Sequence, residues 1–387
     1  MMLLPLHLRG TISGLRPDLY KILKLEEALL QHFNPAKVLI DLRSGPAADL
    51  VSIASFGFAG VLDSFPRTCP SLHSLTNNAA VAGGDVVRIQ RDGKINLLYR
   101  RGANANTLFV TERCNSRCVM CSQPPRADID DWRIPELISL LPLIDRDLAV
   151  LGLTGGEPTL LGDGFIRLVE AAKGLLPATR LHVLTNGRTF ADRRFVEAFD
   201  CVRGHVNWGI PLYGDVAHLH DHVVQAKGAF AETVHGLYNL AERRHRIEIR
   251  TVLHAHTLPR MEHLARFLYR NAPFAEHIAL MGLEPMGFAR SNMPLLHVDP
   301  DEVGRRIVGA VEFLHQVGMH VSIYNIPLCA LPPVIRPFAR KSISDWKNQY
   351  AESCDACVVK ESCCGFFKST TSEEREATAR PLVEVAA

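Results

Sequence analysis

The sequence has almost no net charge and no long apolar run. Its 43 Lys and Arg residues are balanced by 41 Asp and Glu residues, so the formal net charge is +2. With this balance the protein has no overall positive electrostatic potential that would attract nucleic acid or an anionic membrane. The most apolar stretch, Ile134 to Leu153, is interrupted by Asp145, Arg146 and Asp147, so it falls short of the roughly 20 apolar residues of a membrane span. We therefore expect no nucleic-acid partner and no membrane partner.

A secretory signal and a disordered composition are also missing. The first ten residues, MMLLPLHLRG, contain neither a basic n-region nor a small-residue cleavage site, so we expect a cytoplasmic protein. The 387 residues, of which 47% are hydrophobic, are enough to bury a full-sized core. In a reducing compartment the ten cysteines cannot be read as a disulfide scaffold. Clustered cysteines in this chain therefore indicate metal or redox chemistry.

Short apolar segments alternate with amphipathic segments of helical length between Thr107 and Pro300. The expected strands are residues 107–111, 148–154, 180–186, 205–213, 247–254 and 277–284. This alternation predicts an α/β fold with a parallel sheet covered by helices. Six such units suit a partial barrel as well as an open sheet, and periodicity alone does not distinguish the two.

Three parts are expected along the chain. Residues 1–104 form a small N-terminal α+β domain, with a helix over residues 18–32 and a hairpin at Asp92-Gly93. Residues 105–300 form the core, and residues 301–387 form a C-terminal extension that contains several cysteines. The N-terminal part is interpreted either as a docking domain or as a cap over the core.

The strongest motif is the segment TERCNSRCVMC, which follows the first strand of the core. Three residues separate Cys114 from Cys118, and two residues separate Cys118 from Cys121. Three thiolates can hold three corners of a cubane iron–sulfur cluster and leave the fourth iron open to bind a molecule. A zinc site or a set of buried cysteines is the alternative, and the lack of a nearby fourth ligand at zinc-finger spacing disfavours it.

This triplet and the ends of the next two strands resemble the radical SAM superfamily. The segment TGGEP at 154–158 resembles the GGE motif, whose backbone groups receive the α-amino group of S-adenosylmethionine (SAM), and LTNG at 184–187 resembles the TNG turn. The resemblance implies a partial (β/α)6 TIM-like barrel and a [4Fe-4S] cluster that reductively cleaves SAM to a 5′-deoxyadenosyl radical. The cofactor-binding residues that it implies are Gly155, Gly156, Glu157, Asn186, Met120 against the adenine, and Arg250 near the methionyl carboxylate or ribose.

Two of these residues, and a group of three histidines, also have explanations that involve no cofactor or metal. Met120 is equally well explained as a hydrophobic residue of the loop, and Arg250 as a solvated arginine at a strand edge. The alternating histidines 218, 220 and 222 invite a metal interpretation, but no outer-shell partners are evident. We therefore expect these histidines at the surface.

A second cysteine group lies in the C-terminal extension. Cys354, Cys357 and Cys363 have a spacing similar to extensions that hold auxiliary clusters in radical SAM peptide maturases. With Cys329 as a fourth ligand, such a cluster would be fully coordinated. A structural zinc satisfies the same tetrahedral demand, and Cys364 is an alternative to Cys363.

Whole segments of the chain, from about Thr107 to Phe367, are similar to one narrower family, the radical SAM maturase C of His-Xaa-Ser peptide systems (HxsC). The continuation CSQPPR at 121–126 is its most distinguishing piece. This resemblance implies a ribosomally made precursor peptide as substrate, with a second radical SAM maturase, a small companion protein and an electron donor as partners. The alternatives are a radical SAM enzyme that acts on a small molecule or cofactor precursor, and a non-catalytic iron–sulfur electron-transfer protein.

Overall fold

The computed structural model describes residues 6–31, 33–43, 53, 55–103, 105–341 and 347–383. The chain divides into two compact units. The first comprises residues 1–108, 132–151 and 171–179, and the second comprises residues 109–131, 152–170 and 180–387. The predicted domain boundary at residue 104 lies outside the described residues. Among the residues that the structure describes, no helix is long and apolar enough to cross a membrane.

The first unit is built on a mixed sheet of eight strands. The strands are β1 (His7–Arg9), β2 (Thr11–Ser13), β3 (Leu19–Leu23), β4 (Val38–Asp41), β5 (Gly60–Leu62), β6 (Ser71–His73), β7 (Val86–Ile89) and β8 (Lys94–Tyr99). Their order across the sheet is β1-β8-β7-β3-β4-β5-β6-β2. Strands β3 to β6 are parallel, and the remaining pairs are antiparallel. The hairpin predicted at Asp92-Gly93 joins β7 to β8, with Gly93 at a φ of +75°.

Strand β3 stands where a helix over residues 18–32 was predicted, and that prediction was wrong for residues 19–23. All five residues of β3 are buried, since β4 and β7 flank the strand. The helix is confined to α1 (Leu25–Leu30). In the middle of β3, the fully buried Lys21 donates from Nζ to the carbonyls of Gly84 (3.1 Å) and Leu143 (2.7 Å) and to Asp145 Oδ1 (2.9 Å). All three ammonium protons thus have acceptors, which makes the burial of this charge tolerable.

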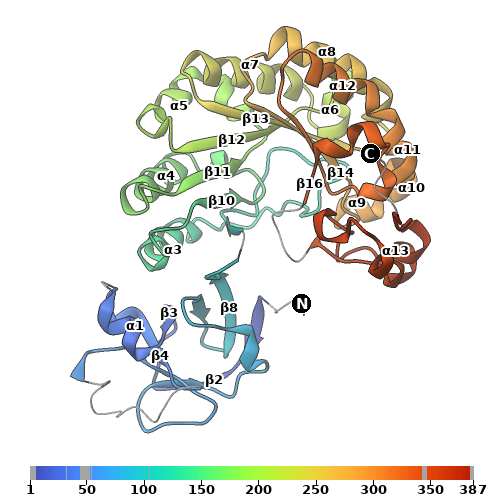
Figure 1. Ribbon diagram of the computed structural model, residues 1–387. Coiled ribbons are helices and arrows are strands. Elements are labelled where there is room, and N and C mark those ends of the chain that lie inside the picture. Colours follow the sequence, from blue (N-terminus) through green and yellow to red (C-terminus); the bar gives the residue numbers. More distant parts are fainter. Residues whose placement is uncertain are drawn as a thin grey trace. The chain divides into compact units, whose positions relative to one another are not determined.

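A second sheet of eight strands curves into a nearly closed barrel (Figure 1). The strands are β9 (Asn106–Phe109), β10 (Val150–Thr154), β11 (Arg180–Leu184), β12 (Val206–Pro211), β13 (Arg246–Leu253), β14 (His277–Gly282), β15 (Val321–Tyr324) and β16 (Ala339–Arg340). They follow one another in sequence order across the sheet, and the pairs from β11 to β16 are parallel. This arrangement confirms the expected partial barrel and extends it by β15 and β16.

Helices connect the strands and cover the outer side of the barrel (Figure 1). The helices between consecutive strands are α3 (Arg133–Leu140), α4 (Asp163–Leu175), α5 (Arg193–Glu197), α6 (Ala217–Val224), α7 (Ala229–Glu242), α8 (Met261–Asn271), α9 (Phe288–Ser291), α10 (Met293–Leu296), α11 (Pro300–Arg306) and α12 (Val308–Gln316), whereas α13 (Ser372–Thr378) follows the last strand. The buried Trp208 of β12 packs edge-on against Phe190 and Phe199, with ring centroids 4.8 and 5.1 Å apart. Apolar packing of this kind between strands and helices fixes where the strands end.

Candidate functional site

The cysteine triplet lies on the loop that follows β9. Its backbone is tied to the end of α6, because Arg117 N donates to Val224 O (3.0 Å) and Val119 N to Val223 O (2.9 Å). Burial raises the pKa of Cys114 to about 11, with smaller contributions from the charges of Glu157 and Cys121, and it raises the pKa of Cys118 to about 12, with contributions from Cys121 and Cys114. The three thiols are therefore close enough to interact electrostatically, and deprotonating them together needs a compensating positive charge.

Gly155 and Gly156 let the end of β10 pass unusually close to this loop. Gly156 N donates to Thr111 O, and Glu157 N donates to Arg113 O, both at 2.7 Å. A Cβ on Gly156 would lie 2.2 Å from Arg113 O, and one on Gly155 would lie 2.5 Å from Thr111 O. Gly155 also has a φ of +148°, which side chains rarely adopt. The close contact between the two backbones therefore requires glycine at both positions, in addition to the predicted approach of a ligand.

The side chain of Glu157 is fully buried and accepts hydrogen bonds from neighbouring protein groups. Its Oε1 accepts from the hydroxyls of Thr159 (2.6 Å) and Thr185 (2.7 Å), and its Oε2 accepts from Asn186 N (2.5 Å). Burial raises the pKa of Glu157, although these hydrogen bonds oppose the shift. The carboxylate thus joins the segments that follow β10 and β11.

Asn186 connects the TNG turn to the cysteine loop. Its Nδ2 donates to Asn115 Oδ1 (2.6 Å), and the guanidinium of Arg188 donates to Asn115 O (2.5 Å) and Ser116 Oγ (3.2 Å). Sequence reasoning missed Asn115, Ser116 and Arg188. The available signal was their position, since Asn115 and Ser116 lie inside the cysteine motif and Arg188 directly follows the TNG turn.

The structure places Met120 and Arg250 in different surroundings. Met120 is buried in an apolar cluster with Tyr213, Val223 and Leu296, which agrees with its interpretation as a hydrophobic residue of the loop. Its contact with an adenine stays a prediction. Arg250 lies on β13, between β12 and β14, rather than at a sheet edge, so that alternative was wrong.

The histidine trio is not a row of surface side chains. His220 is buried, and its Nδ1 accepts from Tyr213 N (3.3 Å), while its ring stacks on the Tyr213 ring. Burial lowers the pKa of His220 to about 4. His218 and His222 are exposed as expected, and the His222 ring packs edge-on against the His256 ring. The expectation of surface histidines was therefore wrong for His220, because α6 turns this residue toward the barrel.

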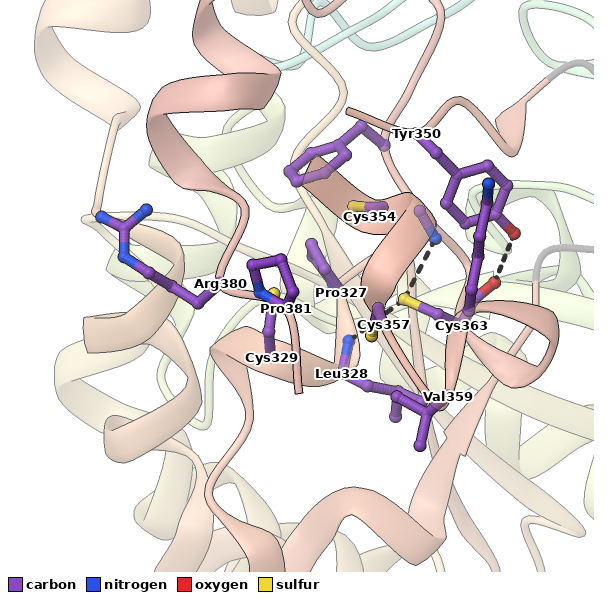
Figure 2. Close-up of a pocket in the computed structure, with 13 residues that line it drawn as sticks. Pro327, Leu328, Cys329, Tyr350, Cys354, Cys357, Val359, Cys363, Arg380 and Pro381 are labelled. Atoms are coloured by element: carbon purple, nitrogen blue, oxygen red, sulfur yellow. Dashed lines mark hydrogen bonds between the residues drawn. The ribbon is translucent and has the colours of Figure 1, made fainter. Parts of the chain in front are cut away.

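Four cysteines of the C-terminal extension line one pocket (Figure 2). Cys329 follows β15, and Cys354, Cys357 and Cys363 come from the irregular segment before α13. Backbone N–H groups of Leu328 and Gly365 donate to Cys363 Sγ, each at 3.4 Å, and Leu382 N donates to Cys357 Sγ at 3.4 Å. Such bonds stabilise thiolates.

Cys363 and Cys364 differ in position and in acidity. Hydrogen bonds from Cys364 and from backbone N–H groups lower the pKa of Cys363 to about 6, whereas the pKa of Cys364 is raised well above its ordinary value. Cys363 lines the pocket, and Cys364 is not among the described residues that line it. Cys363 is therefore the better candidate ligand.

Residues 108–268, which contain the triplet and the strand ends, match the family model described as the Radical SAM superfamily. This segment is a radical SAM domain. Over 177 residues, the chain is 24% identical to the AdoMet-dependent heme synthase of Oleidesulfovibrio alaskensis, and the match covers 44% of each chain. The radical SAM domain implies SAM and a [4Fe-4S] cluster as cofactors.

Solved structures share the fold of this domain. The structure of native anSMEcpe with bound AdoMet is 13% identical, with a TM-score of 0.51 over 70% of this chain and 91% of that chain. The structure of Streptococcus suis SuiB bound to S-adenosylmethionine is 15% identical, with a TM-score of 0.45 over 56% of this chain and 49% of that chain. The chain thus spans less than half the length of the heme synthase and of SuiB.

The thiols of the radical SAM domain fit the cluster that the domain implies. Three cysteine sulfurs on one loop are the donor set of a cubane with one open iron, and a cubane binds each thiolate through a separate iron. Across the described residues, no three His, Cys, Asp or Glu side chains are arranged as ligands of one metal ion. The ligand roles of Cys114, Cys118 and Cys121 stay predictions.

Proposed function

We propose that this protein is a radical SAM enzyme that holds a [4Fe-4S] cluster through Cys114, Cys118 and Cys121. The observation that carries the proposal is the pair of hydrogen bonds from Gly156 N and Glu157 N to the cysteine loop. These bonds fix the glycine-rich strand end beside the thiols. Bound there, the cluster and SAM supply a 5′-deoxyadenosyl radical that abstracts a hydrogen atom from the substrate.

The residues of the chain orient the cofactor and exclude water in this proposal. The backbone of residues 155–157 receives the methionyl amino group of SAM, while Glu157 and Asn186 hold that backbone in place. The buried Tyr213 and Met120 close the apolar side of the cysteine loop. A dry, preorganised site protects a radical from quenching.

A second proposal concerns the pocket in the C-terminal extension. Cys329, Cys354, Cys357 and Cys363 are proposed to hold an auxiliary [4Fe-4S] cluster, supported by the gathering of these four thiols and by the N–H groups that donate to two of them. Full coordination by four thiolates suits electron transfer or site architecture. A structural zinc is the alternative, since four thiolates also satisfy its tetrahedral preference.

The proposed substrate is a ribosomally made peptide of the His-Xaa-Ser type. The sequence segments that resemble HxsC support this choice. The structure of anSMEcpe with bound AdoMet and Cp18Cys peptide has a fold similar to that of this chain, with a TM-score of 0.50. This likeness is compatible with a peptide substrate. The proposed partners are a second radical SAM maturase, a small companion protein and an electron donor, in the cytoplasm.

A small-molecule substrate is the second candidate. The match to the AdoMet-dependent heme synthase favours it, because that name describes an enzyme of cofactor synthesis. The two candidates differ in what accelerates SAM cleavage. Stimulation by a His-Xaa-Ser precursor peptide supports the first, and stimulation by a tetrapyrrole precursor supports the second.

The deciding experiment measures 5′-deoxyadenosine formed from SAM by anaerobically reconstituted, dithionite-reduced protein. We expect the wild type to form it and Cys118→Ala to form none, because the loss of one thiolate leaves the cubane with two. If wild-type protein that contains iron and sulfide forms none, even with the companion proteins added, the enzyme assignment fails. A non-catalytic electron-transfer role then becomes the better explanation.

Metal analysis tests the auxiliary cluster separately. We expect about eight irons per wild-type chain and about four in Cys354→Ala, with Cys201→Ala as the matched control at the wild-type value. One zinc and about four irons in the wild type would assign zinc to the C-terminal pocket.

A further inference from the structure

A compact polar cluster occupies the inner face of the barrel. Glu248 and Arg250 of β13 are two residues apart and therefore share one face. Glu248 pairs with Gly209 on β12 and with His277 on β14. His182 of β11 reaches the same place, because its Nε2 lies 3.5 Å from Glu248 Oε1. Three strands, β11, β13 and β14, thus bring polar side chains to one point, and β12 contributes only Gly209 there.

The carboxylate of Glu248 is the centre of this cluster. Its side chain is only 9% exposed, His277 Nδ1 lies 2.8 Å from Oε2, and the Arg250 guanidinium donates to Oε1. Burial alone would raise the pKa of Glu248, but His182, His277 and Arg250 together hold it well below its ordinary range. Glu248 is therefore ionised at neutral pH and can only accept hydrogen bonds.

Arg250 is held at two points of its guanidinium. One terminal nitrogen donates to Glu248, and the other lies 3.0 Å from Met281 Sδ. Gly209 provides the necessary space, because a Cβ there would lie 3.1 Å from Arg250 Cδ and 3.0 Å from His182 Nε2. A long side chain fixed in this way loses little rotamer entropy when it binds a ligand.

Tyr213 connects this cluster to the cysteine loop. It follows Leu212, whose N donates to Arg250 O (3.0 Å), and it packs in one apolar cluster with Met120 of the cysteine loop. Cys118 and Val252 lie against the same cluster, and Val252 is two residues from Arg250 on β13 and shares its face. Arg250 therefore lies on the strand face that meets the cysteine loop.

We propose that Glu248 is a positioning residue that acts through Arg250, holding its guanidinium in place to receive the methionyl carboxylate of SAM. This inference rests on the proposed function. His277 supports it by fixing the carboxylate of Glu248, and His182 Nε2 lies 3.5 Å from the oxygen that accepts from Arg250.

Equilibrium dialysis of radiolabelled SAM against the reconstituted full chain tests the proposal. We expect Glu248→Asp, which keeps the charge but withdraws the carboxylate by one methylene, to raise the Kd by roughly tenfold. Glu248→Gln keeps the acceptor position and should stay within about threefold of the wild type. In an Arg250→Gln background, Glu248→Asp should cause no further loss, because coupled residues are not additive. Glu276→Asp changes an ion pair with Arg246 of the same strand and serves as the matched control.

Decarboxylated SAM provides the second arm of the experiment. Glu248→Asp should leave its affinity unchanged, because the group that Arg250 receives is missing. Three outcomes would each overturn the positioning role. They are equal losses of affinity for both ligands, additive effects on the Kd in the Arg250→Gln background, and a lower thermal midpoint with unchanged SAM affinity. If the wild type contains iron and sulfide but binds no SAM, the proposed function itself fails, whichever variant is used.

Discussion

The carboxylate of Glu157 shows how a single side chain can join three motifs that are far apart in sequence. It accepts hydrogen bonds from residues that follow β10 and β11, and the N–H of the same residue binds the cysteine loop. The sequence motif identifies the residue, but its side-chain partners depend on which strand ends lie together. Those partners follow from the parallel order of the strands.

Glu157→Gln should destabilise the protein. A glutamine amide places an N–H₂ group against the N–H or hydroxyl donors that now bind the carboxylate, and an unsatisfied buried polar group costs about 1–3 kcal/mol. We expect a lower free energy of unfolding in urea and less iron after reconstitution. Glu242→Gln, which alters an exposed ion pair with Arg193, is the control and should change neither quantity. Equal stability of both variants would contradict the structural role of Glu157.

Three buried histidines predict a loss of stability in mild acid. Burial lowers the pKa of His220 and His245 to about 4 and that of His254 to about 3. Each ring accepts a hydrogen bond at Nδ1, from Tyr213 N, Trp208 Nε1 and His256 N respectively, which requires the neutral form.

The sign of this pH dependence follows from proton binding. The folded pKa values lie below the unfolded value of about 6.5, so the unfolded chain binds more protons below that pH. The stabilisation is complete above pH 6.5 and is lost as the pH falls toward 4. At pH 5 each histidine should cost about 1–2 kcal/mol, measured by urea unfolding at pH 7 and pH 5. His254→Asn keeps an acceptor near Nδ1 and should flatten the dependence, and an unchanged slope would contradict the assignment.

At the scale of elements, the barrel sets how close the cysteine loop and the end of β10 must come. Gly156→Ala adds a Cβ that would meet Arg113 O at 2.2 Å, a backbone atom that moves only with the whole loop. We expect loss of the two hydrogen bonds to the loop, a stability decrease of about 2 kcal/mol, and reduced iron incorporation.

Gly174→Ala is the matched control for this glycine substitution. Gly174 lies in α4, and a Cβ there would meet nothing within 4 Å. Replacing a helical glycine by alanine should stabilise the protein by about 0.5–1 kcal/mol without changing the iron content. If both variants load iron like the wild type, the close approach of the two backbones is not needed for the site.

Most elements of the barrel were predictable from the sequence, because strand and helix periodicities alternate clearly from β10 to β15. The segment from Leu19 to Leu23 was not, since a strand buried on both faces has no alternation to distinguish it from a buried helix. Cysteine spacing likewise indicated both thiol groups. The cluster around Glu248 could not be predicted, because it depends on the register of four strands.

At the scale of the whole molecule, the first unit is discontinuous in sequence. Asp145 binds Lys21 and Arg101, both of which lie more than forty residues before it, and all three belong to the first unit. Burial alone would raise the pKa of Asp145, but its bonds to Arg101 and Lys21 hold it at about 2. The carboxylate is thus the main compensation for a fully buried ammonium group.

Asp145→Ala should therefore be among the most destabilising changes in this unit. It leaves the charge of Lys21 unpaired in the interior, and breaking one side of a buried ion pair costs about 3–5 kcal/mol. Lys21→Met removes the buried charge and should cost less, because Asp145 keeps Arg101. Urea unfolding measures both, and the control Lys94→Met breaks an exposed pair with Asp92 and should have no effect. A smaller loss for Asp145→Ala than for Lys21→Met would contradict this account.

The burial of Lys21 also affects when the first unit can complete its folding during translation. Its acceptor Asp145 follows it by 124 residues. At about 5–20 residues per second, the ribosome delivers that carboxylate roughly 6–25 s after the lysine. Until then, of the three acceptors of this ammonium group, neither Leu143 O nor Asp145 is complete, and Gly84 O is the one already synthesised. The buried lysine therefore gains its full set of acceptors only after a segment of the first unit that is far downstream in the sequence has been synthesised.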